Sequence, residues 1–290
     1  MKRKINYFSF IKNQFNEYLR YISKSQTTYL IILAGFIGVL AGFSAVGFRY
    51  LIEFFQKLAI GNSQEIISTL TEMSWQLKLT IPVIGACIVG PLIYFFAREA
   101  KGHGVPEVMH DVALKNAVIR PRVAVVKSLA SAITIATGGS VGREGPIVQI
   151  GSALASAVGQ WFKVSSESLK ILVGCGAAAG IAATFNAPIA GAFFALEIIL
   201  GNFALPSFSP IIISSVVATA ISRHFLGDFP AFITPEYALV SAWEIPLYVI
   251  LGAIAGSVSV LFSKTLYFAE DAFDKIPVPE YLKNPIGGLV

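Results

Sequence analysis

Residues 138–146 contain four glycines, an arginine, a glutamate and a proline, residue types suited to an anion site made of backbone groups. Glycine permits tight turns and proline is favoured in the first turn of a helix, so the apolar residues that follow predict a helix starting near Gly145. The first N–H groups of such a helix lack partners and carry roughly +0.5 elementary charge. This end of the helix is therefore suited to bind a small anion.

Glu144 places a carboxylate at the mouth of this predicted site, with glycines on both sides that keep it mobile. A carboxylate there would act as a tethered anion in the position of a free one. Protonation, or competition from a free anion, would release it. Arg143 and Glu144 also permit a simpler interpretation, a structural ion pair or helix cap. We favour the structural interpretation for Arg143. For Glu144 we favour the gating interpretation, because ionisable residues inside membranes usually serve function and this one is flanked by glycines.

Residues 102–107 repeat the same pattern, with a glycine-flanked turn and a proline ahead of a predicted helix that reaches about residue 116. This second helix N-terminus would face the same anion, and His103 would be the side-chain donor at the turn. The alternative for His103 is a histidine in a surface loop.

Residues 174–197 predict a helix of small residues, a break at residues 186–188 and a second apolar helix. Small residues let membrane helices approach closely, so most of this segment is expected to be scaffold. Glu197 near its end is either a buried structural carboxylate or a proton relay, and we favour the structural interpretation.

The composition places these segments in a membrane. Of 290 residues, 55% are hydrophobic and 13% are charged, whereas soluble domains carry about 25% charged residues. The net charge of +5 comes mainly from the N-terminus and one later stretch, a distribution typical of the cytoplasmic side of membrane proteins, and no nucleic acid partner is expected. Cys87 and Cys175 lie in apolar segments without metal-ligand neighbours, so both are expected to be buried thiols with no metal site.

A membrane span needs about 20 apolar residues. The first is expected at residues 28–55 and the second at 79–97, joined by a polar linker over 61–78. Two spans return the chain to its starting side, so the basic N-terminus and the later basic stretch share one side, which we take to be the cytoplasm. That stretch comprises Arg98, Lys101, Lys115, Arg120, Arg122 and Lys127.

Residues 1–27 mix aromatic and basic residues at near-helical spacing and are expected to form a cytoplasmic interfacial segment, with a flexible tail as the alternative. Several later helices are short and interrupted, and broken helices inside a membrane usually mark an ion or substrate site. Close helix packing is expected at Gly35, Gly38, Gly42 and Gly47 of the first span. Further helices are expected at 105–116, 121–137, 145–163, 168–184, 188–203, 208–226 and 244–268, and the first turn of another at 285–290.

Three segments together resemble the CLC family of chloride channels and chloride/proton exchangers. Residues 142–146 match its signature and residues 102–106 match an earlier glycine-proline loop. Residues 186–188, with Gly191 and Glu197, match a third segment. The resemblance covers roughly residues 28–290.

The resemblance implies an all-α integral membrane fold, a multi-pass bundle of tilted and broken helices that is the first of two inverted-topology halves. Residues 28–290 would be this transmembrane domain, in the cell membrane with a cytoplasmic N-terminus. The family also implies a homodimer, formed here through residues 188–203 and 208–226.

The implied function is transmembrane transport of chloride or a similar small anion through a pore gated by Glu144. No enzymatic activity is expected, and no cofactor besides the transported chloride. Glu197 is a weak candidate for a proton pathway. The residues implied to bind the anion are His103, Gly104, Val105, Pro106, Arg143, Gly145 and Pro146.

The sequence departs from the family pattern at three points. His103 stands where the family commonly has serine, which leaves the anion preference open. Ile198 stands where exchangers often carry an internal proton-transfer glutamate, which favours a channel without settling the choice. The family's second half is missing, so we expect a carboxy-terminal half elsewhere in the same or another chain.

Three alternatives stay open at this point. The first is a proton-coupled chloride antiporter. The second is an intramembrane serine hydrolase around Ser140, which would need His103, His110 or His224 as its base. The third is a remnant that binds a partner subunit and transports nothing.

Overall fold

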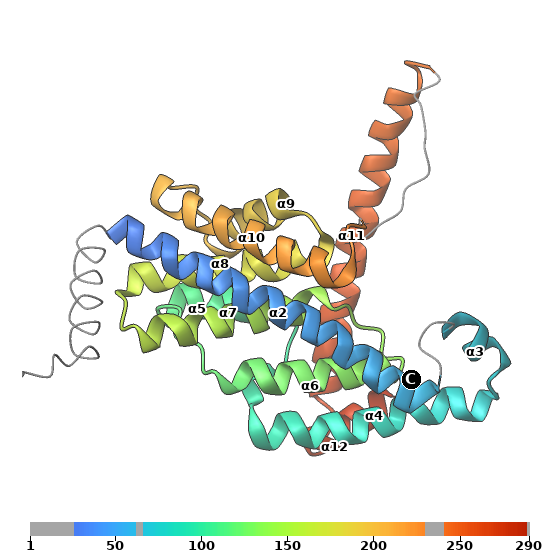
Figure 1. Cartoon of the computed structure of the whole chain (residues 1–290). Coiled ribbons are helices and arrows are strands. Elements are labelled where there is room, and N and C mark those ends of the chain that lie inside the picture. The colour runs from blue at the N-terminus through green and yellow to red at the C-terminus, as the bar shows by residue number, and fades with distance from the viewer. Residues whose placement is uncertain (1–25, 62–65, 230–240, 289–290) are drawn as a thin grey trace, which may run out of the picture.

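The computed structural model describes residues 26–61, 66–229 and 241–288, and all regular structure within them is helical (Figure 1). The predicted interfacial segment at residues 1–27 falls almost wholly outside the described residues. The all-α prediction is confirmed, and most expected helices form within a few residues of their predicted bounds.

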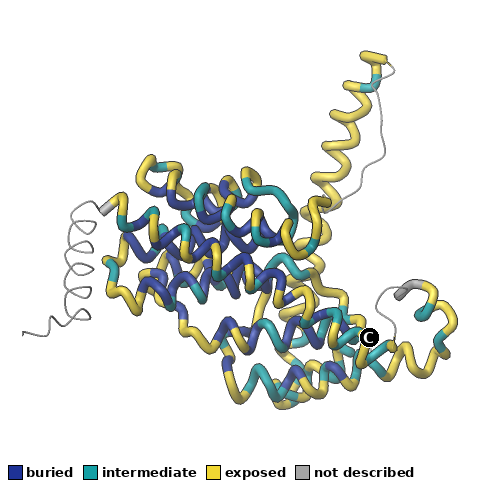
Figure 2. The backbone as a smooth tube through the Cα atoms, in the orientation of Figure 1, coloured by how far each residue is buried: buried dark blue, intermediate teal, exposed yellow. Residues whose placement is uncertain are grey.

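Four long helices make the body of the molecule: α2 (Gln26–Ile60), α7 (Glu144–Trp161), α8 (Ser166–Phe185) and α10 (Leu205–Leu226). Helix α8 lies at the centre, in contact with the other three. Every residue from 172 to 183 of α8 is buried, which Figure 2 shows as a dark core. The body is therefore organised around the small-residue helix that the sequence predicts as scaffold.

Small residues and hydroxyl groups hold the body together. Lipid tails are as apolar as leucine, so membrane helices associate through close packing and hydrogen bonds. A Cβ added at Gly38 of α2 would meet the Ser214 carbonyl oxygen of α10 at 2.6 Å. The Ser214 hydroxyl donates to the Cys175 carbonyl at 3.1 Å, and the Ser222 hydroxyl donates to the Ala183 carbonyl at 2.7 Å.

The prediction for the four glycines of the first span is half right. Gly38 and Gly42 both lie against α10, but a Cβ at Gly35 or Gly47 would meet nothing within 4 Å. A glycine in this span therefore allows close packing only at positions where a neighbouring helix lies against it.

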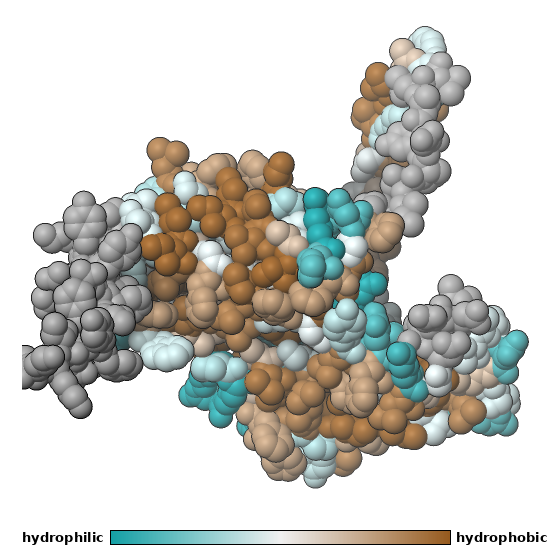
Figure 3. All heavy atoms as spheres, in the orientation of Figure 1, coloured by the Kyte–Doolittle hydropathy of each residue, from teal (hydrophilic) through white to brown (hydrophobic). Residues whose placement is uncertain are grey.

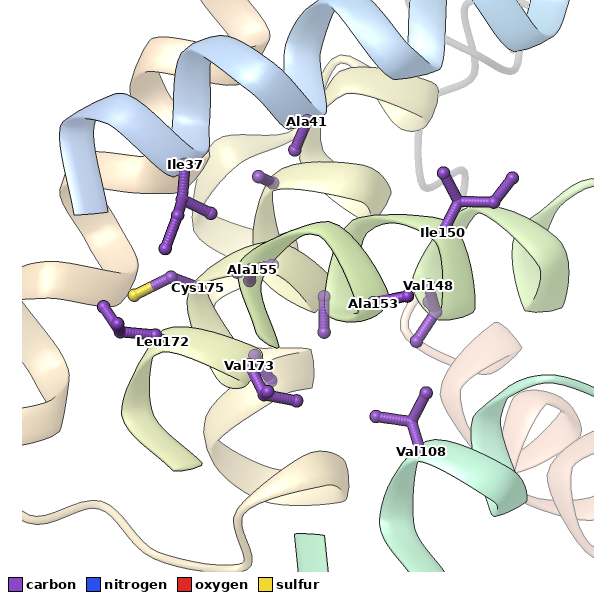
Figure 4. Close-up of a cluster of buried hydrophobic side chains, with 14 of the residues drawn as sticks. Ile37, Ala41, Val108, Val148, Ile150, Ala153, Ala155, Leu172, Val173 and Cys175 are labelled. Carbon is purple, nitrogen blue, oxygen red and sulfur yellow. The ribbon is translucent and has the colours of Figure 1, made fainter. Parts of the chain in front are cut away.

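The apolar core is formed where α2, α5 (Val105–Leu114), α7 and α8 meet (Figure 4). Cys175 is completely buried here, as expected, whereas Cys87 is exposed on α4, so the prediction of a buried thiol is wrong for Cys87. The labelled core residues are Ile37, Ala41, Val108, Val148, Ile150, Ala153, Ala155, Leu172, Val173 and Cys175.

A second layer consists of α4 (Trp75–Phe96), α6 (Arg122–Ala136) and α12 (Glu280–Gly287). Helix α12 packs on α4, where a Cβ at Gly90 would lie 2.5 Å from the Tyr281 carbonyl oxygen. Two predictions are wrong here. The linker at 61–78 contains α3 (Ile66–Glu72), and the last helix begins at Glu280 rather than at residue 285.

Helix α11 (Glu244–Asp274) leaves the body over most of its length and has no buried residue (Figures 1 and 2). Only its C-terminal end returns to the cavity formed by α4, α6 and α12. An apolar helix without protein neighbours is suited to lipid contact.

The chain break predicted at residues 186–188 is present. Asn186 ends α8 in the left-handed conformation (φ 57°), and α9 (Pro188–Phe194) starts two residues later. The Asn186 amide donates to Asp228 at 2.9 Å, and Arg223 pairs with Asp228 at 3.1 Å. The break is thus tied to the C-terminal end of α10.

Among the residues that the structure describes, five helices are long and apolar enough to cross a membrane: α2 from Thr27, α4, α8, α10 and α11. The space-filling view shows a broad apolar surface over the body (Figure 3), as expected when lipid is the solvent. The protein is therefore a multi-pass membrane protein.

Candidate anion-binding site

The two glycine-rich loops lie against each other. Helix α7 starts at Glu144 with Arg143 as its N-cap, and α5 starts at Val105 with Gly104 as its N-cap. A Cβ at Gly104 would lie 3.0 Å from the Gly145 Cα, and a Cβ at Gly145 would overlap the His103 carbonyl oxygen. Gly104 also has a φ of 97°, which residues with a Cβ rarely adopt. The two helix N-termini are therefore brought together, as predicted.

A cavity of about 790 Å³ opens beside these loops, between α4, α6, α12 and the C-terminal end of α11. Four of the predicted site residues line it: His103, Glu144, Gly145 and Pro146. The other predicted residues do not line it. Gly104 is buried against α7, Val105 and Pro106 lie in the first turn of α5, and Arg143 and Glu197 lie elsewhere.

Glu144 is the first residue of α7 and is half-buried at the cavity wall. Its carboxylate folds back over Gly142, where a Cβ would overlap it. Within residues 26–61, 66–229 and 241–288, neither Arg143 nor Glu144 forms an ion pair, and the Arg143 side chain makes no cap hydrogen bond. The proposed structural pair between them therefore has no counterpart in this part of the chain.

His103 is exposed and faces α11, a helix that its sequence position does not predict as a neighbour. Its Nε2 lies 3.4 Å from Glu270 Oε2, and its ring packs edge-on against Tyr267 at 6.3 Å between centroids. Glu270 also lines the cavity. His103 is thus a cavity residue, and Glu270 is a further titratable group there that sequence reasoning missed.

Glu107 caps α5. The Gly104 N–H donates to its carboxylate, so the N-cap N–H of this helix is satisfied by the chain itself. Its position three residues after the N-cap is the sequence signal for such a capping box. The anion-attracting end of α5 thus carries a carboxylate of its own.

Lys127 of α6 is buried beneath the loop before α5. Its Nζ donates to the carbonyl oxygens of Ala100 at 3.0 Å and Gly102 at 2.8 Å. Lys127, which the sequence analysis counts in the basic stretch after the second span, is thus buried, and these two carbonyls compensate its burial.

The other side of the loop is anchored by Glu99, in the short 3-10 turn η1 (Arg98–Ala100). Its carboxylate accepts hydrogen bonds from Arg120 at 2.9 Å and Arg122 at 3.2 Å. Main-chain hydrogen bonding and these arginines hold the pKa of Glu99 below its usual range. The Gln149 amide of α7 donates to the Glu99 carbonyl at 3.2 Å, which ties the loop to the helix that starts at Glu144.

Glu197 lies outside the cavity and is exposed, so the expectation of a buried structural carboxylate is wrong. It belongs to the π-helical turn η2 (Ala195–Ile199), whose buried residues are Ala195, Leu196 and Ile199. That wide turn leaves Glu197 and Ile198 on its outer side. The predicted helix at 188–203 accordingly ends at Ile199.

Ser140 lines the cavity, and in the part of the chain described here no hydrogen bond joins it to a histidine. A serine nucleophile needs a histidine base within reach. The geometry expected of a serine hydrolase is not formed at Ser140.

The fold and site define a multi-pass membrane protein in which two helix N-termini lie against each other and one of them, at α7, opens with a carboxylate onto a cavity. Residues 84–290 match the sequence profile of the family described as voltage gated chloride channel. The chain therefore belongs to this family, and the predicted resemblance is confirmed.

Two relatives illustrate the match. The chain is 34% identical to the chloride channel protein CLC-f of Arabidopsis thaliana, over 90% of this chain and 35% of that protein. It is 32% identical to the H+/Cl− exchange transporter ClcA of Vibrio parahaemolyticus, over 88% of this chain and 55% of that one. The chain thus spans between about a third and just over half of the length of these relatives.

Solved structures share the fold. A CLC-type fluoride/proton antiporter superimposes with a TM-score of 0.76 at 26% identity, covering 90% of this chain and 63% of the antiporter. A slow cyanobacterial Cl−/H+ antiporter superimposes with a TM-score of 0.75 at 24% identity, with the same coverage.

Proposed function

We propose that this chain forms the amino-terminal half of a transporter that moves chloride or a similar small anion across the membrane. The observation that carries the proposal is the contact between the loops before α5 and α7, which places the loop before α5, the N-terminus of α7 and Glu144 at one cavity. Helix N-termini attract anions. Membership of a family that includes chloride channels and exchangers supports the same conclusion.

In this proposal Glu144 is the gate. Its ionised carboxylate occupies the anion position at the start of α7, and protonation or a competing anion displaces it. The backbone around Arg143, Glu144 and Gly145 lines the outer part of the anion path. The loop at residues 102–106 lines the part next to it, with His103 at the cavity wall.

Proton-coupled exchange is the second candidate mode, because the relatives and solved structures include proteins named as H+/Cl− and fluoride/proton antiporters. Two observations bear on the choice. Ile198 stands where exchangers often carry a proton-transfer glutamate, which favours a channel, whereas His103 and Glu270 place titratable groups at the cavity.

The experiment uses the complete protein that carries this chain, extracted from its own membranes and weighed intact, then reconstituted into chloride-loaded vesicles. Chloride efflux and proton uptake are recorded in the same vesicles. We expect chloride efflux well above that of empty vesicles. A fixed proton-to-chloride ratio identifies an antiporter, and efflux without proton movement identifies a channel. An absence of chloride efflux contradicts the proposal and favours the partner-binding remnant.

We also propose residence in the cell membrane with the N-terminus in the cytoplasm. The exposed basic residues that follow the second span, Arg98, Arg120 and Arg122, support this orientation, since cytoplasmic loops carry excess lysine and arginine. We propose no enzymatic activity and no cofactor besides the transported anion.

A homodimer through residues 188–203 and 208–226 is a further part of the proposal. Exposed apolar side chains on α9 and α10 support it: Ile189, Phe193, Leu205 and Val216. Replacing Val216 with tryptophan should overpack such an interface by about 1–3 kcal/mol. That is roughly 5- to 150-fold in the dimer dissociation constant, measured as molar mass in detergent.

The matched control is Val258→Trp on α11, where the side chain is 58% exposed and lies outside the proposed interface. This variant should keep the mass of the original protein. Unchanged dimerisation of the Val216 variant would place the interface on another face.

A further inference from the structure

Lys127 is a charged side chain that is only 5% exposed, in a chain that buries few charges. A lysine is almost never fully buried unless its charge has partners. Its two hydrogen-bond partners are the Ala100 and Gly102 carbonyls, at 3.0 and 2.8 Å. All three residues line the cavity beside Glu144. The lysine therefore sits under the loop that leads to His103 and α5.

The two hydrogen bonds determine the direction in which the carbonyl oxygens of Ala100 and Gly102 point. A carbonyl oxygen turned toward the cavity would repel an anion, whereas the N–H end of a helix attracts one. By accepting from Lys127, the Ala100 and Gly102 oxygens are held toward the ammonium group and their partial negative charge is compensated. The loop can then pass beside Gly145 without presenting free carbonyls to the anion.

Glu107 makes a cation necessary at this place. Its carboxylate accepts from the Gly104 N–H and lies against Gly102, so a negative charge sits at the N-terminus of α5. Lys127 and Glu107 both contact Gly102: the Lys127 ammonium donates to its carbonyl at 2.8 Å, and the Glu107 carboxylate lies against its Cα.

Two other basic side chains near this loop face acids. Lys101 pairs with Asp274 at 3.5 Å and with Glu280 at 3.9 Å, and His103 faces Glu270. Arg98 lies over the Tyr94 ring at 4.2 Å, so Lys127 is the cation that contacts the same glycine as Glu107.

We propose that Lys127 is a positioning residue for the anion site, which neutralises Glu107 and holds the loop carbonyls so that the N-terminus of α5 attracts a small anion. The inference rests on the proposed function and deepens it. Lys127 does not touch the anion in this arrangement; it acts through Glu107 and through the loop at residues 100–104.

The test compares three variants of the complete protein: Lys127→Met, Glu107→Gln and the double variant. Glutamine can still accept the Gly104 N–H but carries no charge. Chloride binding is measured by calorimetry in detergent, and chloride flux against chloride concentration in vesicles. We expect Lys127→Met to raise the chloride dissociation constant about tenfold, the order of the effect of a charge at a partly buried helix terminus. The double variant should bind within about threefold of the original protein, since both charges are gone.

Glu107→Gln alone should bind chloride more tightly than the original protein, because the lysine is then unopposed. This single variant keeps the inference testable if Lys127→Met does not fold. The control is Lys115→Met, which removes an exposed lysine paired with Asp111 at 2.7 Å and should not change chloride binding.

Two outcomes would overturn the inference: chloride binding unchanged by Lys127→Met, or chloride binding weakened by Lys127→Met and not restored in the double variant. The second would mean that Lys127 does not act by neutralising Glu107, which contradicts the proposed charge balance. Weaker binding by Glu107→Gln would overturn it too. An original protein that binds chloride but shows no flux would instead count against the proposed transport function, while the binding comparison still decides the role of Lys127.

Discussion

Replacing Glu144 with alanine is expected to abolish the dependence of chloride flux on pH. In the original protein the ionised carboxylate blocks the anion position at the start of α7, and acid releases it, so flux should rise as pH falls. The alanine variant should give the same flux at every pH, measured as chloride efflux from vesicles.

The variant Glu144→Gln should behave like permanently protonated glutamate and carry flux that is independent of pH. The matched control is Glu167→Ala, which removes an exposed glutamate whose partner is Lys170, 3.2 Å away on the surface of α8. That variant should keep the pH response of the original protein. If Glu144→Ala keeps both the flux and its pH response, Glu144 is not the gate.

The sequence predicts the part of this site that depends on local chain geometry. The two loops before α5 and α7 can be predicted because glycines and prolines lie within nine residues of each helix start. Glycine permits the tight turns and proline favours the first helical turn, so both act on the local backbone directly. Their contact with each other follows less directly, since it depends on how α5 and α7 pack. We expect this contact because both helix N-termini are predicted to face the same anion.

The contacts that sequence reasoning missed are those between distant segments. Glu270 lies 167 residues after His103, and no local pattern connects them. In the sequence Lys127 does not differ from the other basic residues of its stretch. Only the structure shows that its ammonium donates to the Ala100 and Gly102 carbonyls. Charge counting treats every lysine as solvated, but a lysine inside a bundle is tolerated where backbone oxygens face it.

The exposure of Glu197 could not be predicted from the sequence for a different reason. Helical periodicity of 3.6 residues predicts which side of α9 a residue occupies, but the π turn at Ala195–Ile199 changes that period. The carboxylate therefore lies outside the core although its neighbours Leu196 and Ile199 are buried. Nothing in the order of residues around it marks where the widened turn begins.

Replacing Gly145 with alanine is expected to reduce chloride flux at least about tenfold and to lower stability. The new Cβ would overlap the His103 carbonyl oxygen, and the clash is with backbone rather than with a flexible side chain. Overpacking of this kind typically costs about 1–3 kcal/mol. Relieving the clash would push the loop before α5 away from the start of α7 and separate the two N-termini. Vesicle efflux and the thermal unfolding midpoint measure the two effects.

The matched control is Gly47→Ala in α2, where a Cβ would meet nothing within 4 Å. Alanine is preferred over glycine inside a helix by roughly 0.5–1 kcal/mol, so this variant should be slightly more stable and transport at the original rate. A Gly145 variant that is as stable as the original but transports poorly would place the effect in the site itself. One that transports normally would mean that the contact between the two loops is not needed for the anion path, because the clash cannot be avoided without moving them apart.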